Sequence, residues 1–423
     1  MQIKIKPGNL AGTVNIPPSK SITHRAIMIA SLAYGTSLIK NYVKSDDINF
    51  TIRACRELGA EIKTYDNRLI INGVNGKFSL HGKTKTLFVG ESGTTLRFLT
   101  ALSVLTDGTV VIDGEKKLRE RPVGELLKVL MTQGIEARSI NDNDCAPVEI
   151  RGGKIRGGKI SVLSDKSSQF ASALLLISPY AQKDIELIPV SLKSQPYLEI
   201  TSNIMAKFGA EIERNNSSYL IKKGKKYHGL DMKIEGDWTQ ASYFAVAAAV
   251  TGTTVYLTNL NMNSSQGDRK IISLLISMGC KIMGNHERVS ITGDRLNAIS
   301  EDLGDFPDIV PSMCIAAAFA KGKSTFTNIG HLVYKESNRL ESVCLELSKM
   351  GISAKYGVDH ITITGGKPKG TVVDTHNDHR IAMSFAVAAL AAEGETIISK
   401  AEVVNKSYPD FYKDLKILGA IIL

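Results

Sequence analysis

Apolar residues gather in six stretches that are small and hydrophobic along nearly their whole length. A helix with one solvent face would show a 3.6-residue alternation, so this pattern predicts buried helices. The six stretches are SKSITHRAIMIASLAYG, SGTTLRFLTALSVLTDG, SSQFASALLLISPYA, WTQASYFAVAAAVTG, FPDIVPSMCIAAAFAKG and NDHRIAMSFAVAALAAEG.

A second pattern follows each of these stretches: an apolar helix end, then a glycine, then the start of a strand, as in CRELGAEI and LKILGAII. A glycine after a helix commonly adopts the left-handed C-cap conformation, so each phrase predicts a helix end. β-rich stretches such as TVVIDG lie between the helices. The phrases recur every 68 to 75 residues, at Gly59, Gly134, Gly209, Gly279, Gly351 and Gly419.

Each repeat is therefore expected to contain strands and two helices, one of them buried. A single hydrophobic core rarely exceeds about 250–300 residues, so six repeats predict an α/β (α+β) fold of two lobes with three repeats each. We expect one lobe at residues 17–235. The other lobe would combine residues 1–16 with 236–423, with crossover segments near 15–18 and 234–237. If the two ends of the chain meet to close the fold, the first strand would lie in the C-terminal lobe.

Polar residues gather at the N-terminal ends of the six buried helices. Ser, Thr and Asp accept hydrogen bonds from unpaired N–H groups there, so capping is the expected role of Ser167, Asp237 and Asp308 taken singly. Capping does not explain the cations at the same ends, because the helix dipole disfavours positive charge there. A bound anion would reverse that cost. These cations are Lys20, Arg25, Arg97 and Arg380.

A further helix is expected over residues 334–351, where Leu340, Val343 and Leu347 form an apolar face. Lys335 and Arg339 would stand four residues apart in its first turn and repel each other. Either a bound anion or Glu336 would relieve this repulsion, and the pattern alone leaves both open.

The composition is that of an average globular protein, with 43% hydrophobic and 22% charged residues among 423. No apolar run reaches the length of a membrane span, and the first twenty residues are expected to form a strand rather than a signal peptide. Five scattered cysteines without a CxxC pair predict a reduced, cytoplasmic protein without structural zinc. The net charge of +10 suits small anionic substrates or nucleic acid.

Ten motifs, in order and with matching spacing, resemble those of the EPSP (5-enolpyruvylshikimate-3-phosphate) synthase family over the whole chain. The resemblance implies six βαβαββ units in two lobes that close on their substrates, an inside-out α/β barrel. The motifs are PPSKSITHRA, SGTTLRF, RERPVGEL, SSQFASALLL, QPYLEIT, EGDWTQASYF, FPDIVP, KESNRL, NDHRIAM and NKSYPDF.

The resemblance implies transfer of the enolpyruvyl group of phosphoenolpyruvate to the 5-hydroxyl of shikimate 3-phosphate. Phosphate would leave by addition and elimination through a tetrahedral intermediate, without a metal or organic cofactor. The two substrates carry two phosphates and two carboxylates, which suits the cations at the helix starts. The implied partners are these small anions, with no nucleic acid and no membrane, and the implied state is a cytoplasmic monomer.

Site residues are carried over motif by motif. Asp308 is implied as the base for the 5-hydroxyl, Glu336 as the acid and later base at the methyl group, and Lys20 as an assistant. Cations nearby would lower the pKa of both carboxyls, so Glu336 needs a compensating environment to act as an acid. The residues implied to hold shikimate 3-phosphate are Lys20, Ser21, Arg25, Ser167, Ser168, Gln169, Ser194, Asp308 and Lys335. Those implied to hold phosphoenolpyruvate are Lys20, Gly93, Arg121, Gln169, Arg339, Arg380 and Lys406.

Four positions depart from the family's usual pattern, and none of them is a residue assigned to chemistry. Glu91 and His331 stand where asparagine is frequent, Asn338 stands where aspartate is frequent, and Phe98 stands where proline is common.

Two alternative functions are considered. UDP-N-acetylglucosamine enolpyruvyl transferase shares the fold but typically carries a reactive cysteine where this chain has LRERPVGEL, and no cysteine lies between Cys55 and Cys145. A ring-shaped nucleic-acid clamp would spread Lys and Arg along helix faces instead of gathering them at helix starts.

Overall fold

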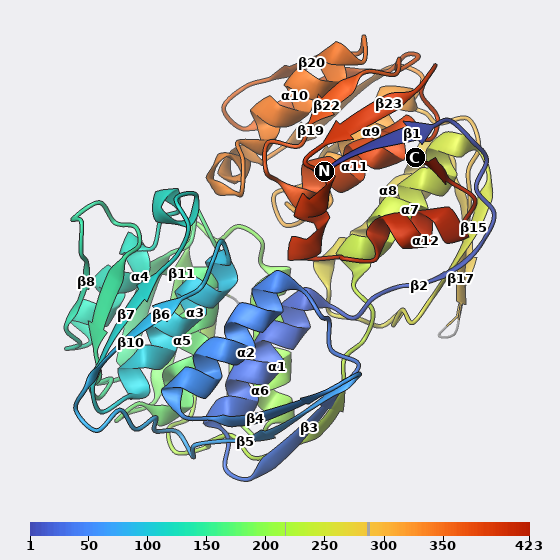
Figure 1. Ribbon diagram of the computed structural model, residues 1–423. Helices are drawn as coiled ribbons and strands as arrows, with labels where there is room; N and C mark the ends of the chain where they lie inside the picture. Colours follow the sequence, from blue (N-terminus) through green and yellow to red (C-terminus); the bar gives the residue numbers. More distant parts are fainter. Residues whose placement is uncertain (216, 286–287) are drawn as a thin grey trace. The chain divides into compact units, whose positions relative to one another are not determined.

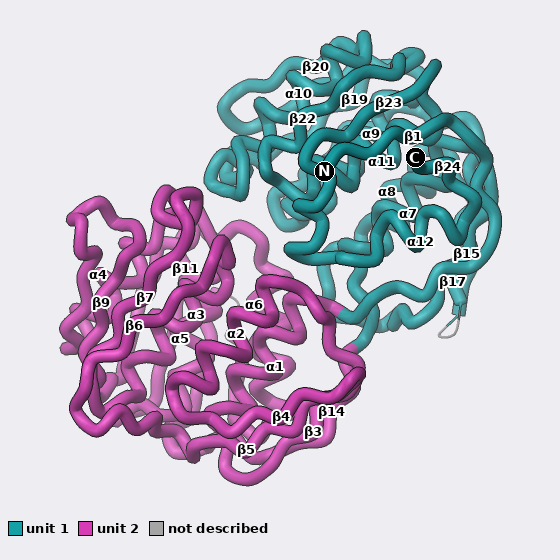
Figure 2. Tube along the Cα trace, in the orientation of Figure 1, with its two compact units in different colours: residues 1–18, 235–423 teal, residues 19–234 magenta. Residues whose placement is uncertain are grey.

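The computed structural model describes residues 1–215, 217–285 and 288–423. The chain divides into two compact units, each with its own hydrophobic core (Figure 2). Unit 1 contains Met1–Pro18 and Glu235–Leu423, and unit 2 is Ser19–Ile234. These boundaries fall within two residues of the lobe boundaries expected from the sequence.

The described strands form six four-stranded sheets, three in each unit (Figure 1). In unit 2 the sheet orders are β14-β3-β5-β4, β6-β7-β9-β8 and β10-β11-β13-β12. The strands are β3 (Thr36–Lys40), β4 (Glu61–Tyr65), β5 (Arg68–Asn72), β6 (Thr84–Phe88), β7 (Thr109–Asp113), β8 (Ala137–Ser139), β9 (Val148–Arg151), β10 (Gly158–Leu163), β11 (Ile185–Val190), β12 (Ile212–Asn215), β13 (Ser218–Ile221) and β14 (Asp231–Lys233).

In unit 1 the sheet orders are β2-β15-β17-β16, β18-β19-β21-β20 and β22-β23-β1-β24. The strands are β1 (Gln2–Lys6), β2 (Gly12–Asn15), β15 (Thr254–Thr258), β16 (Lys281–Gly284), β17 (Arg288–Thr292), β18 (Ser300–Asp302), β19 (Lys323–Thr327), β20 (Ser353–Tyr356), β21 (His360–Thr364), β22 (Val372–Asp374), β23 (Thr396–Ser399) and β24 (Ile421–Ile422).

Every sheet combines one parallel pair with two antiparallel pairs. In the second repeat, for example, β6 and β7 are parallel and are joined through a helix, whereas β9 is antiparallel to both β7 and β8. A parallel connection needs a crossover, and in four of the six sheets the apolar helix between the two paired strands supplies it. The two-lobe fold of mixed sheets expected from the repeats is confirmed.

Some sheets combine strands that lie far apart in the sequence, including those at the two ends of the chain. Strand β1 pairs with β23 and β24, so the first strand lies with the C-terminal residues, as the closed-fold argument predicted. Strand β2 pairs in parallel with β15, and in unit 2 the late strand β14 pairs with the early strand β3.

The six apolar stretches all form helices, and nearly every residue in them is buried. In α7, for instance, every residue from Trp238 to Ala249 is buried. These helices are α1 (Lys20–Leu32), α3 (Gly93–Leu102), α5 (Gln169–Ile177), α7 (Trp238–Thr251), α9 (Val310–Phe319) and α11 (His379–Ala389). In unit 1, α7, α9 and α11 pack against one another.

The second helix of each repeat ends where the glycine pattern predicted. All six capping glycines have φ between 79° and 116°, the left-handed region in which a side chain is costly. These helices are α2 (Asp46–Leu58), α4 (Gly124–Thr132), α6 (Pro196–Lys207), α8 (Ile271–Met278), α10 (Arg339–Lys349) and α12 (Phe411–Ile417). Within the described ranges, none of the helices has the length and hydropathy needed to span a bilayer.

Candidate active site

The predicted site residues fall into two groups, one in each unit, and most of them lie at or near the N-terminal ends of helices. In unit 1 the group is centred on Arg339, the first residue of α10, whose side chain is only 1% exposed. Its Nε donates to Asp378 Oδ2 over 2.8 Å, its Nη1 to Asp308 Oδ1 over 3.1 Å, and its Nη2 to Glu336 Oε2 over 2.6 Å. One guanidinium therefore orients both proposed catalytic carboxylates.

Asp308 joins Arg339 to a second arginine. Its Oδ2 accepts from Arg380 Nη2 over 2.6 Å, while Arg380 Nη1 donates to the hydroxyl of Tyr243 over 3.4 Å. The capping role expected for Asp308 is wrong, since Ile309 occupies the N-cap of α9. Two buried guanidiniums attract the carboxylate more strongly than neutral backbone N–H groups would.

The capping expectation holds for Asp237 and in part for Ser167, which lies one residue before the N-cap Ser168 of α5 and still accepts from a backbone N–H there. Asp237 caps α7 by accepting from the backbone N–H groups of Thr239 and Gln240. Ser167 Oγ accepts from the backbone N–H of Gln169 over 3.2 Å at the start of α5. Asp378 caps α11 as well, because it accepts from Arg380 N over 2.9 Å in addition to its bond with Arg339.

Burial by itself would lower the pKa of Arg339, but the carboxylates of Asp378 and Glu336 outweigh it and hold that pKa above its usual range. Arg339 therefore stays charged. Removing one side chain of this group is expected to destabilise the protein, because the other charge of a buried ion pair is then left without compensation.

The sequence placed Lys335 and Arg339 together in the first turn of one helix, and this is wrong. Helix α10 begins at Arg339, and Lys335 ends the preceding 3₁₀ turn η5 (Gly330–Tyr334) as its C-cap. The protein partner considered for Arg339 is confirmed, since Glu336 pairs with it. Asn338 caps α10 by accepting from Glu341 N. Asparagine therefore provides the N-cap hydrogen bond that the aspartate common at this position can also form.

Lys406 also belongs to unit 1. It is the last residue of the 3₁₀ helix η6 (Ala401–Lys406) and is 9% exposed.

In unit 2 the site residues begin with Lys20, the first residue of α1. Its Nζ pairs with Asp47 Oδ2 over 2.9 Å, and both side chains are largely buried. Asp47 was not identified from the sequence. It lies in the first turn of α2, where an acidic residue is usually explained by the helix dipole.

Arg25 lies one turn further along α1 and is 2% exposed. It donates from Nε to Thr201 Oγ1 over 2.7 Å and from Nη2 to Ser172 Oγ over 3.4 Å. It also donates to the backbone carbonyls of Ser21 and Tyr197. Burial lowers the pKa of Arg25 to about 10, and no carboxylate among the described residues pairs with it. A buried guanidinium held only by neutral oxygens is suited to an anionic ligand.

Phe98, one of the departures from the family pattern, has a structural role beside this arginine. The Arg25 guanidinium lies 5.0 Å from the centre of the Phe98 ring, so the aromatic face offsets part of the cost of burying the cation.

The starts of α3 and α5 come together through Gln169. Its Nε2 donates to Thr94 Oγ1 over 2.9 Å, and its Oε1 accepts from Arg97 Nη1 over 2.8 Å. Arg97 Nη2 also donates to the carbonyl of Pro122 over 2.9 Å, which ties the loop that carries Arg121 to α3.

Gly93 and Arg121 are in close contact in this loop region. A Cβ atom at Gly93 would lie 2.5 Å from Arg121 Cζ, closer than real Cβ atoms approach a heavy atom. The absence of a side chain at Gly93 therefore lets the Arg121 guanidinium lie against the start of α3.

The predicted serines occupy separate places in unit 2. Ser168 is the N-cap of α5 and is buried. Ser194 is buried in the turn before α6, with φ of 60°. Ser21 lies in the first turn of α1 and is partly buried.

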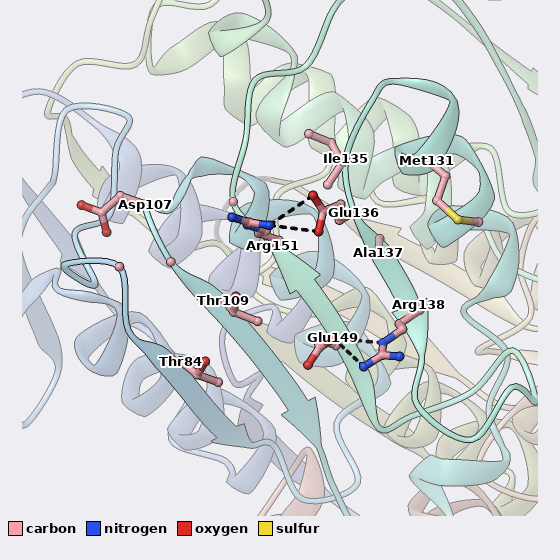
Figure 3. A pocket seen from close by; sticks show the side chains of 13 residues that line it. Thr84, Asp107, Thr109, Met131, Ile135, Glu136, Ala137, Arg138, Glu149 and Arg151 are labelled. Atoms are coloured by element: carbon pink, nitrogen blue, oxygen red, sulfur yellow. Dashed lines mark hydrogen bonds and ion pairs between the residues drawn. The ribbon is translucent and has the colours of Figure 1, made fainter.

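A pocket on the outer side of the β6-β7-β9-β8 sheet has a different character (Figure 3). Figure 3 shows Arg151 directed at Glu136 and Arg138 directed at Glu149, so these four charged side chains form two ion pairs. None of the predicted site residues lines this pocket. Among the residues the structure describes, no group of three His, Cys, Asp or Glu side chains is placed to hold a metal ion.

Comparisons with known proteins agree on one family. The family model described as EPSP synthase (3-phosphoshikimate 1-carboxyvinyltransferase) matches residues 5–415. A 3-phosphoshikimate 1-carboxyvinyltransferase of Methanococcus maripaludis is 38% identical over 100% of this chain and 99% of that protein. The protein of the same name from Methanocella arvoryzae is 40% identical over 99% of each chain. The solved structure of EPSP synthase from Acinetobacter baumannii superposes with a TM-score of 0.85 at 28% identity, covering 100% of this chain and 99% of that one.

Proposed function

This chain belongs to the EPSP synthase family, and from that membership together with the two groups of side chains we infer which residues carry out its reaction. The reaction transfers the enolpyruvyl group of phosphoenolpyruvate to the 5-hydroxyl of shikimate 3-phosphate and releases phosphate. It proceeds by addition and elimination through a tetrahedral intermediate and serves the shikimate pathway. Activity on UDP-N-acetylglucosamine is not favoured, because the full-length relatives carry the shikimate name.

Asp308 is the proposed base that removes the proton from the 5-hydroxyl. The observation that carries this proposal is the bridge of Asp308 between Arg339 and Arg380 at 3.1 and 2.6 Å. Two guanidiniums fix both carboxylate oxygens, and a base must be held in a defined orientation to meet its proton. The Asp308 side chain is 18% exposed, so one edge of it remains accessible.

Glu336 is the proposed acid that delivers a proton to the enol methylene and later takes one from the methyl group. Its Oε2 is bonded to Arg339 Nη2, and its side chain is 12% exposed. Lys20 is proposed to assist, with Asp47 holding its ammonium group in place. Ammonium and guanidinium groups stabilise the negative charge that develops as phosphate leaves.

The anionic groups of the substrates are proposed to meet the cations described above. For shikimate 3-phosphate the proposed contacts are Lys20, Ser21, Arg25, Ser167, Ser168, Gln169, Ser194, Asp308 and Lys335. For phosphoenolpyruvate they are Lys20, Gly93, Arg121, Gln169, Arg339, Arg380 and Lys406. Arginine suits such contacts because its planar fork pairs two oxygens at once.

We propose that the partners are these small molecules and not nucleic acid or membrane, and that the protein works as a monomer in the cytoplasm. All five cysteines are free, which supports a reducing compartment.

The decisive experiment measures phosphate release from the purified protein. Release should require both shikimate 3-phosphate and phosphoenolpyruvate and should persist with a metal chelator present. Replacing shikimate 3-phosphate by UDP-N-acetylglucosamine should abolish it. Release that depends on the nucleotide sugar would overturn the substrate assignment.

A further inference from the structure

The loop between β22 and α11, residues 375–378, is held by a buried carboxylate that the proposed mechanism does not use. Glu346 belongs to α10 and is fully buried. Its Oε1 accepts from His376 Nε2 over 2.8 Å, and its Oε2 accepts from the backbone N–H of Asp374 over 3.1 Å. Lys349 Nζ donates to both oxygens, over 2.8 and 2.9 Å. Glu346 therefore bonds to the loop and to the end of the strand before it.

The other end of the loop is held by the first residue of the same helix. Arg339 donates from Nε to Asp378 Oδ2 over 2.8 Å. Arg339 and Glu346 are about two turns apart, so they lie on the same face of α10. This helix packs against both β22 and α11 (Figure 1). One contact at Asp378 would let the loop pivot about it, and the second contact, at Glu346, removes that freedom.

The backbone of the loop needs such support. His376 and Asn377 both have positive φ, at 51° and 56°, a conformation that persists only where the surrounding structure holds it. Within the loop, His376 N donates to Asp374 Oδ1 and Asp378 N donates to the carbonyl of Thr375, each over 2.8 Å. Because Asp378 is only two residues after His376, a displacement of His376 is transmitted to the start of α11.

Arg380 is the residue whose position depends on this loop. It lies in the first turn of α11, and its backbone N–H donates to Asp378 Oδ1 over 2.9 Å. Its guanidinium donates from Nη2 to Asp308 Oδ2 over 2.6 Å. A binding group must be held in a defined place, since a misplacement of about 1 Å can cost roughly 10²-fold in rate.

We propose that Glu346 and His376 are positioning residues for phosphoenolpyruvate, because their hydrogen bond fixes the loop that sets the place of the Arg380 guanidinium. The proposal rests on the proposed role of Arg380 in holding this substrate. Glu346 and His376 touch no substrate in this scheme and act only through the loop.

The charges around His376 make this contact dependent on pH. The hydrogen bond with Glu346 is the largest influence and raises the pKa of His376 above its ordinary value of about 6.5. Asp374 acts in the same direction and Lys349 opposes it, while Lys400, which precedes η6, acts on Asp374. Below the pKa of His376 the bond is ionic, and above it the bond is between a neutral ring and a carboxylate and is weaker.

The first test compares KM for phosphoenolpyruvate in the wild type and in His376→Asn. Asparagine tolerates the positive φ, and His376 is partly exposed, so the variant is expected to fold. At about pH 6 the substitution should raise this KM roughly fivefold, and at about pH 8.5 by less than about twofold. Ionisation of the substrates affects both proteins equally and cancels in the ratio. Equal KM values at about pH 6 would overturn the proposal.

The same experiment distinguishes binding from chemistry. KM for shikimate 3-phosphate and kcat should both stay within about twofold of wild type. The value of kcat should be preserved because Arg339 still holds Asp308, over 3.1 Å. A fall in kcat with an unchanged KM for phosphoenolpyruvate would contradict the assigned role.

A double-mutant cycle tests whether Glu346 and His376 act as one unit. Glu346→Gln keeps the shape of the side chain and removes its charge, and it should raise KM for phosphoenolpyruvate by a factor similar to that of His376→Asn. Adding His376→Asn to Glu346→Gln should raise it by less than about twofold more, because both changes remove the same bond. Two factors that multiply in the double variant would overturn the proposal.

Lys349→Met is the matched control, because it removes a bond of the same carboxylate that does not involve the loop. It should keep KM for phosphoenolpyruvate within about twofold of wild type, even if the melting temperature falls. If Lys349→Met raises this KM as much as His376→Asn does, the effect comes from lost stability and the positioning role fails.

Two further measurements separate this proposal from its premise. An NMR titration of the His376 ring needs no turnover, and its midpoint should lie above about pH 6.5 in the wild type and lower in Glu346→Gln. An unchanged midpoint would overturn the proposal. Arg380→Lys keeps the charge but loses the planar fork, so KM for phosphoenolpyruvate should rise about tenfold. If this KM does not rise, the role of Arg380 fails and the proposal fails with it. If it rises while His376→Asn behaves as wild type, the proposal for Glu346 and His376 alone fails.

Discussion

The Nε atom of Arg339 donates to Oδ2 of Asp378 over 2.8 Å, and this bond joins the start of α10 to the start of α11. Asp378 is fully buried and also accepts from Ser337 Oγ and from Arg380 N. The aspartate of the NDHR motif therefore serves as a structural anchor. It fixes the arginine that in turn orients Asp308 and Glu336.

Replacing that arginine should destabilise unit 1. Arg339→Met leaves the buried carboxylate of Asp378 without its counter-ion, and breaking a buried ion pair in this way costs about 3–5 kcal/mol. Urea unfolding of the variant should show a loss of that size. The exposed Arg295→Met is the control and should stay within about 0.5 kcal/mol of wild type. If the free energy of unfolding of Arg339→Met is as close to wild type as that of the control, the ion pairs of Arg339 contribute no stability.

Asp308→Ala and Glu336→Ala should each lower turnover by roughly 10²-fold or more, the usual scale for a general base or acid. Both side chains are partly exposed, so the melting temperature should change less than in Arg339→Met. Steady-state kinetics with both substrates checks this. Near-normal kcat in both variants would remove the proposed proton-transfer roles.

Gly93→Ala should raise KM for phosphoenolpyruvate more than it lowers kcat. The new Cβ would lie 2.5 Å from Arg121 Cζ, and the flexible arginine would have to swing away from the start of α3. Gly8→Ala is a matched control, because a Cβ there meets nothing within 4 Å. If Gly93→Ala binds phosphoenolpyruvate as the wild type does, Arg121 does not hold this substrate from its observed position.

Arg25→Gln should abolish the thermal stabilisation that shikimate 3-phosphate gives. Arg25 is buried among neutral oxygens, so a phosphate would supply its missing counter-charge, and a ligand bound only to the folded state raises the melting temperature. Arg138→Gln, at a surface pair in the same unit, should keep the full shift. The hypothesis fails if both variants respond to the ligand equally.

The stability of unit 1 should depend on pH through His376 and Glu346. Glu346 is fully buried and accepts from His376 Nε2 over 2.8 Å and from Lys349 Nζ over 2.8 Å. The hydrogen bond with Glu346 raises the pKa of His376 above its ordinary value of about 6.5. The resulting stabilisation is complete below that ordinary value and disappears as pH rises through the pKa of the folded state.

Glu346 has the opposite dependence. Burial would raise its pKa, but hydrogen bonds from His376 and Lys349 outweigh burial and lower it. Its contribution is present above its ordinary pKa of about 4.5 and is lost as pH falls through the lowered value. Both contributions are complete between about pH 4.5 and about pH 6.5.

His376→Asn should therefore lower the melting temperature more at about pH 5.5 than at about pH 8.5. Asparagine tolerates the positive φ of 51° at this position. His81→Asn is the matched control, because His81 is exposed and has φ of 52°. A loss that is independent of pH would mean that the bond between His376 and Glu346 has no ionic character.

The sequence by itself determined the six repeats, the buried helices and the glycines that end the other helices. Small apolar stretches form buried helices because every face of them can pack, and glycine ends a helix because a left-handed residue satisfies the last carbonyls without a Cβ penalty. These signals are local, so Gly59 and Gly419 could be recognised without knowing their neighbours. The same holds for Asp237, whose capping bonds reach only two and three residues along the chain.

Only the tertiary structure decided which charges meet. Asp308 has the sequence appearance of a cap, yet it lies between Arg339 and Arg380, which are 31 and 72 residues away. Asp47 gave no signal in the sequence, because an acidic residue at a helix start has an ordinary local explanation. Long-range pairing depends on which helix ends the sheets bring together. No local pattern in the sequence gives the distance in space between two such helix ends.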